Sequence, residues 1–337
     1  MIIDAHTHTL CPAVNQMVAD TIAPDSIPYQ RDMSPESKAR DAEQFGELGQ
    51  KFNDLERRFA DMAAMGVDRQ VIAPAPGQQH YWAPPDLLVA VSRAQNDHVA
   101  GLVGKAPERF IGVGTLPLTD PAAAVAEIER AVGLGLVAFQ TDSRAGEREL
   151  SDAALDPVYA ALERHGAGLM IHPLGFSHGQ RLAPFFMVNS IAQPLEELIA
   201  FNHLVFGGVL DRFPRLKVFI PHGGGFAPYY IGRFDHTWKV RPEVNRLAPK
   251  PPSAYLSRIT FDTCVFNPAD IARLVALVGA DRVMLGSDYP FDMGDTAPRE
   301  TLRRAGLSDT EIATIETRTA QSFFTLEPPS APDNHQS

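Results

Sequence analysis

Short, nearly uninterrupted apolar runs recur along the chain and alternate with longer stretches of helical periodicity. Continuous apolar runs of this length are typical of strands that are buried on both faces of a parallel sheet. Eight strands are predicted in this way: Ile2–Ala5, Gln70–Ala73, Phe110–Thr115, Val137–Gln140, Gly168–His172, Lys217–Pro221, Ile259–Asp262 and Val283–Asp288.

Helical stretches separate these strands, and several begin at Asp or Pro and end at Gly, as helix capping predicts. The clearest are Asp54–Met65, Asp86–Gly104, Pro121–Val132, Asp156–His165, Gln193–Asp211 and Pro268–Val278. Strand and helix alternating eight times predict an α/β fold, a (β/α)8 TIM barrel. A doubly wound open sheet is the competing architecture, and it is disfavoured because no GxGxxG motif follows the first strand.

Two internal segments and the end of the chain depart from this pattern. Residues 12–51 are polar, carry several prolines, and show no strand and little periodicity. Residues 239–253 read as a loop, and residues 327–337 as a disordered tail. We expect one barrel domain over residues 1–326, with the 12–51 insertion at the barrel mouth, where it would cover a site.

Composition and charge narrow the possible partners and the compartment. The chain has 337 residues and a net charge of -11, which argues against a nucleic-acid partner. It has no signal-peptide pattern and no run of ~18 apolar residues, so no membrane association is expected. Its two cysteines, Cys11 and Cys264, form no CxxC pair and suggest reduced thiols in a cytoplasmic protein.

Polar residues with metal-binding chemistry stand at the carboxyl ends of several predicted strands. His6 and His8 follow the first strand at i and i+2, where both side chains point to one side. His172, His222 and Asp288 end the fifth, sixth and eighth strands. Each alone is equally well a hydrogen-bonded strand-end residue. Together they predict one shared site, because barrel enzymes place their chemistry at this end.

A barrel also brings the first and eighth strands together, and with them residues 6 and 288. Imidazoles combined with a carboxylate suit Zn²⁺ with a coordination position left for water or substrate. The same ligands also accept Mn²⁺, Fe²⁺ or Co²⁺. We therefore expect a divalent metal cofactor, with zinc as the first choice.

The motifs HTH, IHP, PHGGG and GSDYP resemble those of the amidohydrolase superfamily. Within it, the chain resembles the family of 2-amino-3-carboxymuconate 6-semialdehyde decarboxylase. Further stretches support this: HYWAPPD (80–86), ERFIGVGTLPL (108–118), FGGVLDRFPRLKVFIPHGGGFAPYYIGRFDHTWKVRP (206–242) and DRVMLGSDYPF (281–291). The similarity spans about residues 1–325 and is weakest in the 12–51 insertion.

The resemblance implies roles for individual residues. His222 falls on a histidine that transfers protons and does not bind the metal. Arg241 falls on an arginine that binds a substrate carboxylate in the neighbouring subunit's site, so a homodimer is expected. The implied metal ligands are His6, His8, His172 and Asp288.

Two departures from the family pattern put the substrate in doubt. The family has a second carboxylate-binding arginine in the loop before the first helix, where this chain offers only Arg31 and Arg40. The family's loop after His172 is rich in tryptophan, whereas this chain has Phe185 and Phe186. We expect Phe186 to orient a planar substrate.

The run Glu56-Arg57-Arg58 reads as a solvated helix face.

The resemblance implies a metal-dependent, non-hydrolytic decarboxylase that acts on a carboxylated muconate semialdehyde or a related aromatic carboxylate. Asp288 favours decarboxylation, because some hydrating or hydrolysing relatives carry Glu there. His222 is the expected acid, and Asp288 is expected both to bind the metal and to relay a proton. The alternatives are a metal-dependent hydrolase or hydratase of a lactone or ring-cleavage product, and a non-catalytic metal-binding protein on a retired barrel.

Overall fold

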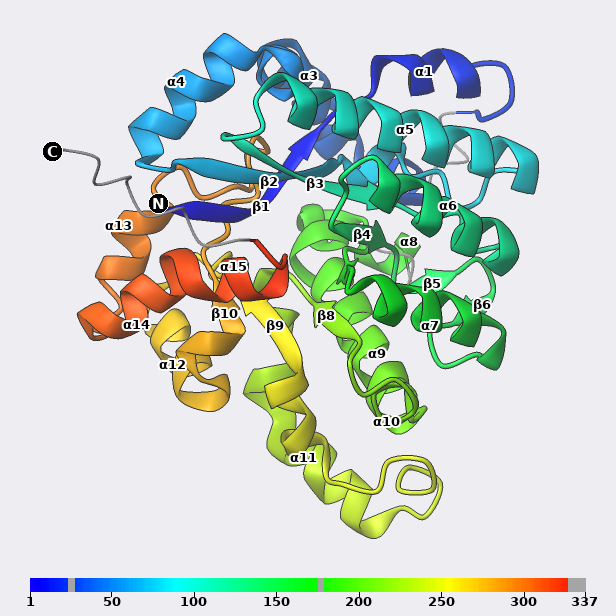
Figure 1. The fold of residues 1–337 in the computed structure, drawn as a ribbon, viewed down its shortest axis with the longest axis vertical. Helices are drawn as coiled ribbons and strands as arrows, with labels where there is room; N and C mark the ends of the chain where they lie inside the picture. The colour runs from blue at the N-terminus through cyan, green and yellow to red at the C-terminus, as the bar shows by residue number, and fades with distance from the viewer. Residues whose placement is uncertain (24–27, 175–178, 327–337) are drawn as a thin grey trace, which may run out of the picture.

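The computed structural model describes residues 1–23, 28–174 and 179–326, so the tail predicted to be disordered lies outside the described residues. Eight parallel strands form one sheet in the order β1-β2-β3-β4-β7-β8-β9-β10 (Figure 1). A separate antiparallel pair joins β5 (Arg144–Ala145) to β6 (Arg148–Glu149). The strands of the main sheet are β1 (Ile3–Thr9), β2 (Arg69–Pro74), β3 (Phe110–Thr115), β4 (Ala138–Thr141), β7 (Gly168–Ile171), β8 (Lys217–Phe219), β9 (Ile259–Asp262) and β10 (Val283–Met284).

The sheet closes into a barrel because the chain after β10 returns to β1. The amide of Ala5 donates to the carbonyl of Leu285 at 2.8 Å, and the amide of Asp288 donates to the carbonyl of His6 at 2.9 Å. The predicted (β/α)8 barrel is therefore confirmed. Its eighth strand is shorter than predicted: β10 pairs regularly with β9 only over Val283–Met284, and the next residues run irregularly along β1.

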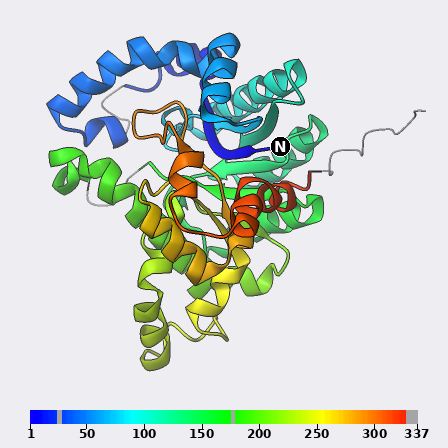
Figure 2. The same ribbon diagram turned by 90° about the vertical axis from the view of Figure 1, so that its left-hand side faces the viewer.

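Helices surround the barrel (Figures 1 and 2). The predicted helix Gln193–Asp211 is divided in two at Gly207-Gly208, where Gly208 has a φ of 69°. The others begin and end within two residues of their predicted bounds. The helices are α1 (Pro12–Val18), α2 (Pro28–Arg31), α3 (Pro35–Asn53), α4 (Leu55–Met65), α5 (Pro85–Lys105), α6 (Pro121–Gly133), α7 (Asp156–His165), α8 (Gly179–Leu182), α9 (Gln193–Phe206), α10 (Val209–Arg212), α11 (Ala227–Val240), α12 (Pro268–Val278), α13 (Pro298–Arg303), α14 (Asp309–Ala313) and α15 (Thr319–Phe323).

The barrel interior is packed with apolar side chains at the end where the strands begin. Ile3, Met170 and Phe219 belong to this buried cluster, together with Phe323 of α15. The amine of Lys217 at the start of β8 donates to the carbonyl of Phe323 at 3.0 Å, which holds α15 across that end. The carboxyl ends of the strands are consequently the end at which a site can open.

The expectation of little periodicity in residues 12–51 was wrong, because much of this segment is helical. Helix α3 runs for 19 residues from Pro35 to Asn53, and the hydroxyl of Ser34 accepts a bond from the amide of Ser37 at 3.2 Å. Pro12, Pro28 and Pro35, which disguised the pattern, stand at helix starts, where proline is tolerated. Residues 241–251 form a loop, in line with the prediction for residues 239–253.

Arg58 on α4 is buried, so its assignment to a solvated helix face was wrong. Its side chain is 1% exposed and donates to the amide oxygen of Gln70 at 3.1 Å and to the carbonyl of His8. Its guanidinium also lies 4.9 Å from the ring centroid of Tyr289. Arg58 thereby joins α4 to the strand that carries the first two histidines.

Helix α11 and the loop after it extend away from the barrel (Figures 1 and 2). The arm, which we define as residues 226–247, exposes large apolar side chains at Tyr230, Val240 and Leu247. Within the described ranges, the structure contains no helix with the length and apolar character needed to span a membrane.

Candidate active site

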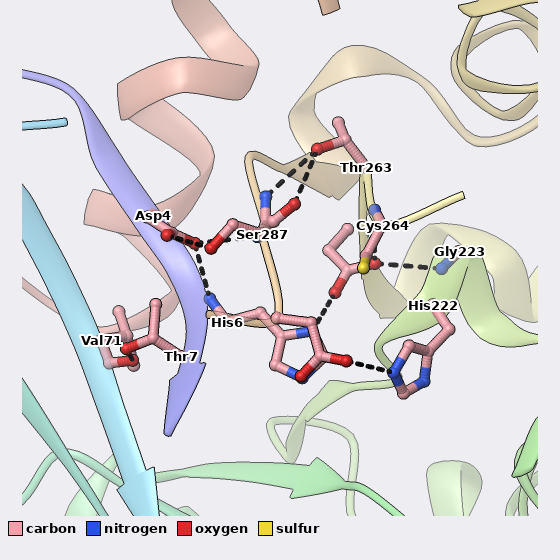
Figure 3. Close-up of polar contacts among 12 residues, drawn as sticks. Asp4, His6, Thr7, Val71, His222, Gly223, Thr263, Cys264 and Ser287 are labelled. Carbon is pink, nitrogen blue, oxygen red and sulfur yellow. Dashed lines mark hydrogen bonds and ion pairs between the residues drawn. The ribbon is translucent and has the colours of Figure 1, made fainter. Parts of the chain in front are cut away.

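Four histidines and one aspartate meet at the carboxyl end of the barrel. The ring centroid of His6 lies 5.1 Å from those of His8, His172 and His222. Asp288 Oδ1 is 3.0 Å from His8 Nε2 and 3.4 Å from His6 Nε2. Asp288 Oδ2 is 3.8 Å from His222 Nε2. The structure therefore brings together all five strand-end residues singled out in the sequence, and Figure 3 shows His6 and His222 approaching one region.

Several polar atoms in this cluster are buried without a hydrogen-bond partner among the described residues. They include both ring nitrogens of His8 and of His172, Nε2 of His6 and Oδ1 of Asp288. Burying unpartnered polar atoms costs free energy, typically ~1–3 kcal/mol for each group. Their concentration at one point, in a set of nitrogen and oxygen donors, fits a site for a divalent cation.

The geometry of the cluster allows more than one set of metal ligands. His6, His172, His222 and Asp288 each offer one donor atom, and these four atoms lie within 4.8 Å of one another. His8 does not belong to that group, although its Nε2 is the imidazole nitrogen closest to Asp288.

Asp262, at the end of β9, orients His6, and the sequence analysis did not assign it this role. Its Oδ2 lies 2.8 Å from Nδ1 of His6, which leaves Nε2 of that ring facing the cluster. Its Oδ1 accepts bonds from the amides of Gly223 at 3.0 Å and Cys264 at 3.1 Å. Metal-binding histidines are commonly oriented by such a carboxylate. Its position at a strand end was the signal that could have identified it.

Glu197 of α9 is the second partner that sequence reasoning missed. Its Oε1 lies 2.5 Å from Nδ1 of His222, and its carboxylate is buried. Burial lowers the pKa of His222, but Glu197 and Asp288 outweigh it and hold that pKa well above its ordinary value. Burial also raises the pKa of Glu197 to about 7, against the opposing effect of His222. Glu197 therefore favours the protonated form of His222 and engages its Nδ1, which leaves Nε2 facing Asp288.

His8, His172 and Asp288 are held in the forms that bind metals. Burial lowers the pKa of His8, and it lowers that of His172 to well below its ordinary value, so both rings stay neutral. Burial raises the pKa of Asp288, but the neighbouring imidazoles, His6 foremost, bring it well below its usual range. Asp288 also adopts a φ of 60°, and His222 a φ of 51°, a conformation that side-chain-bearing residues rarely adopt outside special sites.

A cavity of about 620 Å³ extends from this cluster toward solvent. His172 and Asp288 belong to its wall, and Phe291 and Phe52 contribute aromatic surface. Residues of α1 and α3, within the 12–51 insertion, also line it. A cavity of this size accommodates a small aromatic molecule.

The predicted substrate-binding residues lie in two different places. Phe186 lines the cavity, whereas Arg241 is exposed where α11 ends and is not part of the described lining. Arg31 pairs with Asp32 at 2.8 Å, and Arg40 pairs with Glu43 at 3.4 Å. Neither Arg31 nor Arg40 is among the described lining residues.

Comparisons with known proteins agree with this geometry. An amidohydrolase family model matches residues 3–326. The chain is 32% identical to 2-amino-3-carboxymuconate-6-semialdehyde decarboxylase of Dictyostelium discoideum, over 86% of this chain and 81% of that protein. It is 27% identical to 2-keto-4-carboxy-3-hexenedioate hydratase of a Sphingobium strain, over 86% and 83%.

Solved structures of decarboxylases superpose on nearly the whole chain. The 5-carboxyvanillate decarboxylase of Sphingomonas paucimobilis has a TM-score of 0.84 and 27% identity, covering 97% of this chain and 99% of that one. The corresponding enzyme of Novosphingobium aromaticivorans, complexed with manganese and 4-hydroxy-3-methoxy-5-nitrobenzoic acid, has a TM-score of 0.81 and 24% identity, over 97% and 96%. The chain therefore belongs to the amidohydrolase family, in the branch that includes 2-amino-3-carboxymuconate-6-semialdehyde decarboxylase.

Proposed function

We propose that this protein is a metal-dependent, non-hydrolytic decarboxylase of a carboxylated muconate semialdehyde or a related aromatic carboxylate. The observation that carries the proposal is a cluster of buried metal-binding atoms beside a histidine that is engaged by the Glu197 carboxylate, at the inner end of a cavity of aromatic size. Its relatives include decarboxylases of both substrate types, which supports the same reaction.

The metal ligands in this proposal are His6, His8, His172 and Asp288. Including His8 is supported by the burial of its ring and by its Nε2, which lies 3.0 Å from Oδ1 of Asp288. Nitrogen and oxygen donors of this kind suit zinc, and a relative that contains manganese supports that ion as an alternative. When bound, the divalent ion would act as a Lewis acid that orients the substrate and stabilises developing negative charge.

His222 is the proposed acid. Its Nδ1 is engaged by Glu197, so the proton on Nε2 is the one directed toward the substrate. Transfer of that proton to the carboxylate-bearing carbon forms a C–H bond. The C–C bond to the carboxylate then breaks and CO₂ leaves. The electron pair of the broken bond stays on the substrate and restores its conjugated system. Asp288 would help return a proton to His222, whose Nε2 is 3.8 Å away.

Substrate binding is assigned to Phe186 in the cavity wall and to Arg241 of a second copy of the chain. The arm, which includes Arg241, exposes apolar side chains such as Tyr230 at 55% and Leu247 at 58%, which favours a homodimer. Arginine is suited to this role because its guanidinium binds a carboxylate through two parallel hydrogen bonds.

The same site suits addition of water to the substrate. Hydration is the second candidate reaction, because the chain is also 27% identical to 2-keto-4-carboxy-3-hexenedioate hydratase. A hydratase would use the metal to polarise a carbonyl or activate water. His222 would then donate its proton to a carbon of a C=C bond, instead of to the carbon that bears the carboxylate. The two reactions differ in their products, because hydration releases no CO₂.

The compartment and the domain organisation complete the proposal. Both cysteines are buried and unpaired, which fits a cytoplasmic enzyme. We treat residues 1–326 as one domain, because β1 and the chain after β10 are joined by hydrogen bonds.

The decisive experiment measures CO₂ release by the metal-reconstituted protein from carboxylated muconate semialdehydes and from hydroxylated benzoates. Metal content is measured in the same preparation, and the metal-free protein serves as the control. Release of CO₂ that depends on metal is expected. Water uptake without CO₂ release would favour the hydratase instead.

A further inference from the structure

Asp288 differs from two histidines of the cluster in how its side chain is held. His6 is oriented by Asp262 and His222 by Glu197, each through a contact at its Nδ1. Within the described ranges, the ion-pair contacts of the Asp288 carboxylate are all with imidazoles of the cluster itself. The direction of this carboxylate is therefore set by its backbone, whose φ of 60° is rare for a residue with a side chain.

Asp4, on β1, binds the residue just before Asp288. The amide of Ser287 donates to Oδ1 of Asp4 at 3.0 Å, and the hydroxyl of Ser287 donates to Oδ2 at 2.5 Å. The same hydroxyl accepts a bond from the amide of Tyr289 at 3.1 Å. The residues on both sides of Asp288 are thus tied to one carboxylate, and Figure 3 shows Asp4 and Ser287 in contact.

Further bonds fix this segment to the strands on either side of it. Oδ1 of Asp4 also accepts from the amide of His6 at 3.3 Å, and the amide of Asp288 donates to the carbonyl of His6 at 2.9 Å. The hydroxyl of Thr263, just after β9, accepts a bond from the amide of Gly286 at 3.1 Å. Asp4 thereby joins the metal-binding part of β1 to the backbone that carries Asp288.

Asp4 and Ser287 have no access to the cavity. Both residues are 0% exposed, and neither is among the described lining residues. They therefore cannot contact a substrate, and they can influence the site only through the residues that they hold. Closure of the barrel does not by itself require the Asp4 carboxylate, because backbone bonds such as that between Ala5 and Leu285 already join β1 to the last strand.

We propose that Asp4 and Ser287 form a clamp that positions Asp288 as a metal ligand. The clamp holds the backbone of Asp288 in the left-handed conformation that directs its carboxylate toward His6 and His8. Asp4 is thus a positioning residue that acts through Asp288. The inference rests on the proposed function, because it assumes that the cluster binds a divalent ion. Without the clamp, the backbone of Asp288 would relax to a negative φ and turn the carboxylate away from the imidazoles.

The test measures the affinity for Zn²⁺ by competition with a chelator, starting from metal-free protein. Asp4→Ala should weaken this affinity by about 10- to 100-fold, as is typical when a residue that orients a ligand is removed. Ser287→Ala, which keeps the Asp4 carboxylate, should weaken it by about 10-fold. Asp4→Asn should stay within roughly threefold of the unaltered protein, because its amide oxygen can accept both backbone bonds and its NH₂ can donate to the Ser287 hydroxyl.

A double-mutant comparison separates positioning from a general loss of stability. In protein that carries Asp288→Ala, adding Asp4→Ala should lower the Zn²⁺ affinity by less than ~3-fold, because the residue that Asp4 positions is gone. Asp68→Asn is the matched control. Asp68 accepts a bond at 2.6 Å from the amide of Ile2, just before the start of the same strand, and its substitution should leave the Zn²⁺ affinity unchanged.

Crystal structures of the metal-free unaltered protein and of metal-free Asp4→Ala provide a measurement that depends on neither metal nor turnover. The unaltered protein should keep Asp288 at a φ near 60°. The variant should show a negative φ at Asp288 and a carboxylate that no longer lies against Nε2 of His8. Ser287→Ala takes the place of Asp4→Ala in this comparison if the latter does not fold.

Two outcomes would overturn the clamp. One is a loss of Zn²⁺ affinity from Asp4→Ala that is absent, or equally large in the Asp288→Ala background. The other is an unchanged backbone at Asp288 in the metal-free variants. Both expected results, in a protein that releases no CO₂ from any carboxylate tested, would support the clamp and reject decarboxylation. A protein that holds no Zn²⁺ would reject the proposed metal site, and the metal-free structures would then decide whether Asp4 positions Asp288.

Discussion

Replacing Glu197 by Gln tests how the proposed acid is kept protonated. The amide can still accept a hydrogen bond from Nδ1 of His222, but the negative charge that lies 2.5 Å from that nitrogen is removed. Glu197 is among the groups that raise the pKa of His222, so this pKa should fall in the variant. Activity that requires the protonated ring is lost as the pH rises through this pKa. The alkaline limb of the pH–rate profile should therefore move to lower pH.

The size of this effect can be estimated from the charge that is removed. Two unit charges with centres roughly 4 Å apart interact by about 4 kcal/mol at an effective dielectric constant of about 20. At about 1.4 kcal/mol per pKa unit, that is an upper limit of about three units. The retained hydrogen bond reduces the effect, so we expect the limb to move by about one to two units. At pH values above the original limb, the turnover should fall by about 10- to 100-fold relative to the unaltered protein.

The assay is the initial rate of CO₂ release between pH 5 and 10, with metal content measured for each preparation. Glu196→Gln is the matched control, because the neighbouring carboxylate accepts from the hydroxyl of Ser143 at 2.5 Å, whereas Nδ1 of His222 is engaged by Glu197. Its alkaline limb should stay in place. An unmoved limb in Glu197→Gln, with normal metal content, would refute the assignment of His222 as an acid that depends on Glu197.

Three further substitutions separate proton transfer, metal binding and substrate binding. His222→Ala should retain its metal and lose turnover by at least ~100-fold, and full activity in the metal-loaded variant would remove the role of acid. Asp262→Asn should weaken metal affinity by about 10- to 100-fold, because His6 loses the carboxylate that orients it; competition with a chelator measures this, and unchanged affinity would count against that orientation. Arg241→Ala should chiefly raise KM, and no change in either kinetic constant would reject it as a carboxylate anchor.

Much of the barrel and its reactive end was predictable, because strand-end positions are visible in the pattern of apolar runs. His6 and Asp288 lie 282 positions apart in the sequence, yet knowing that β1 neighbours the last strand was enough to bring them together. Residues 12–51 were harder, because Pro12 and Pro35 mark helix starts and read equally well as loop signals.

The residues that support the site were missed for a different physical reason. Glu197 lies inside a helical stretch, and nothing in its local sequence reveals that the helix turns this carboxylate toward His222. Arg58 was interpreted as solvated because charged residues on helices usually are, but it is satisfied by a backbone carbonyl of β1 instead. Such pairings arise from tertiary packing across distant elements, which periodicity does not encode.

The hydrogen bonds between β1 and the chain after β10 have a consequence for biosynthesis. His6 and His8 are synthesised long before Asp288, the side chain that completes the group, because 279 residues separate Asp288 from His8. A nascent chain therefore cannot assemble the full set of donors and must fold before it can hold an ion at this place. Loss of the C-terminal fifty residues would remove Asp288 and leave an incomplete set of donors.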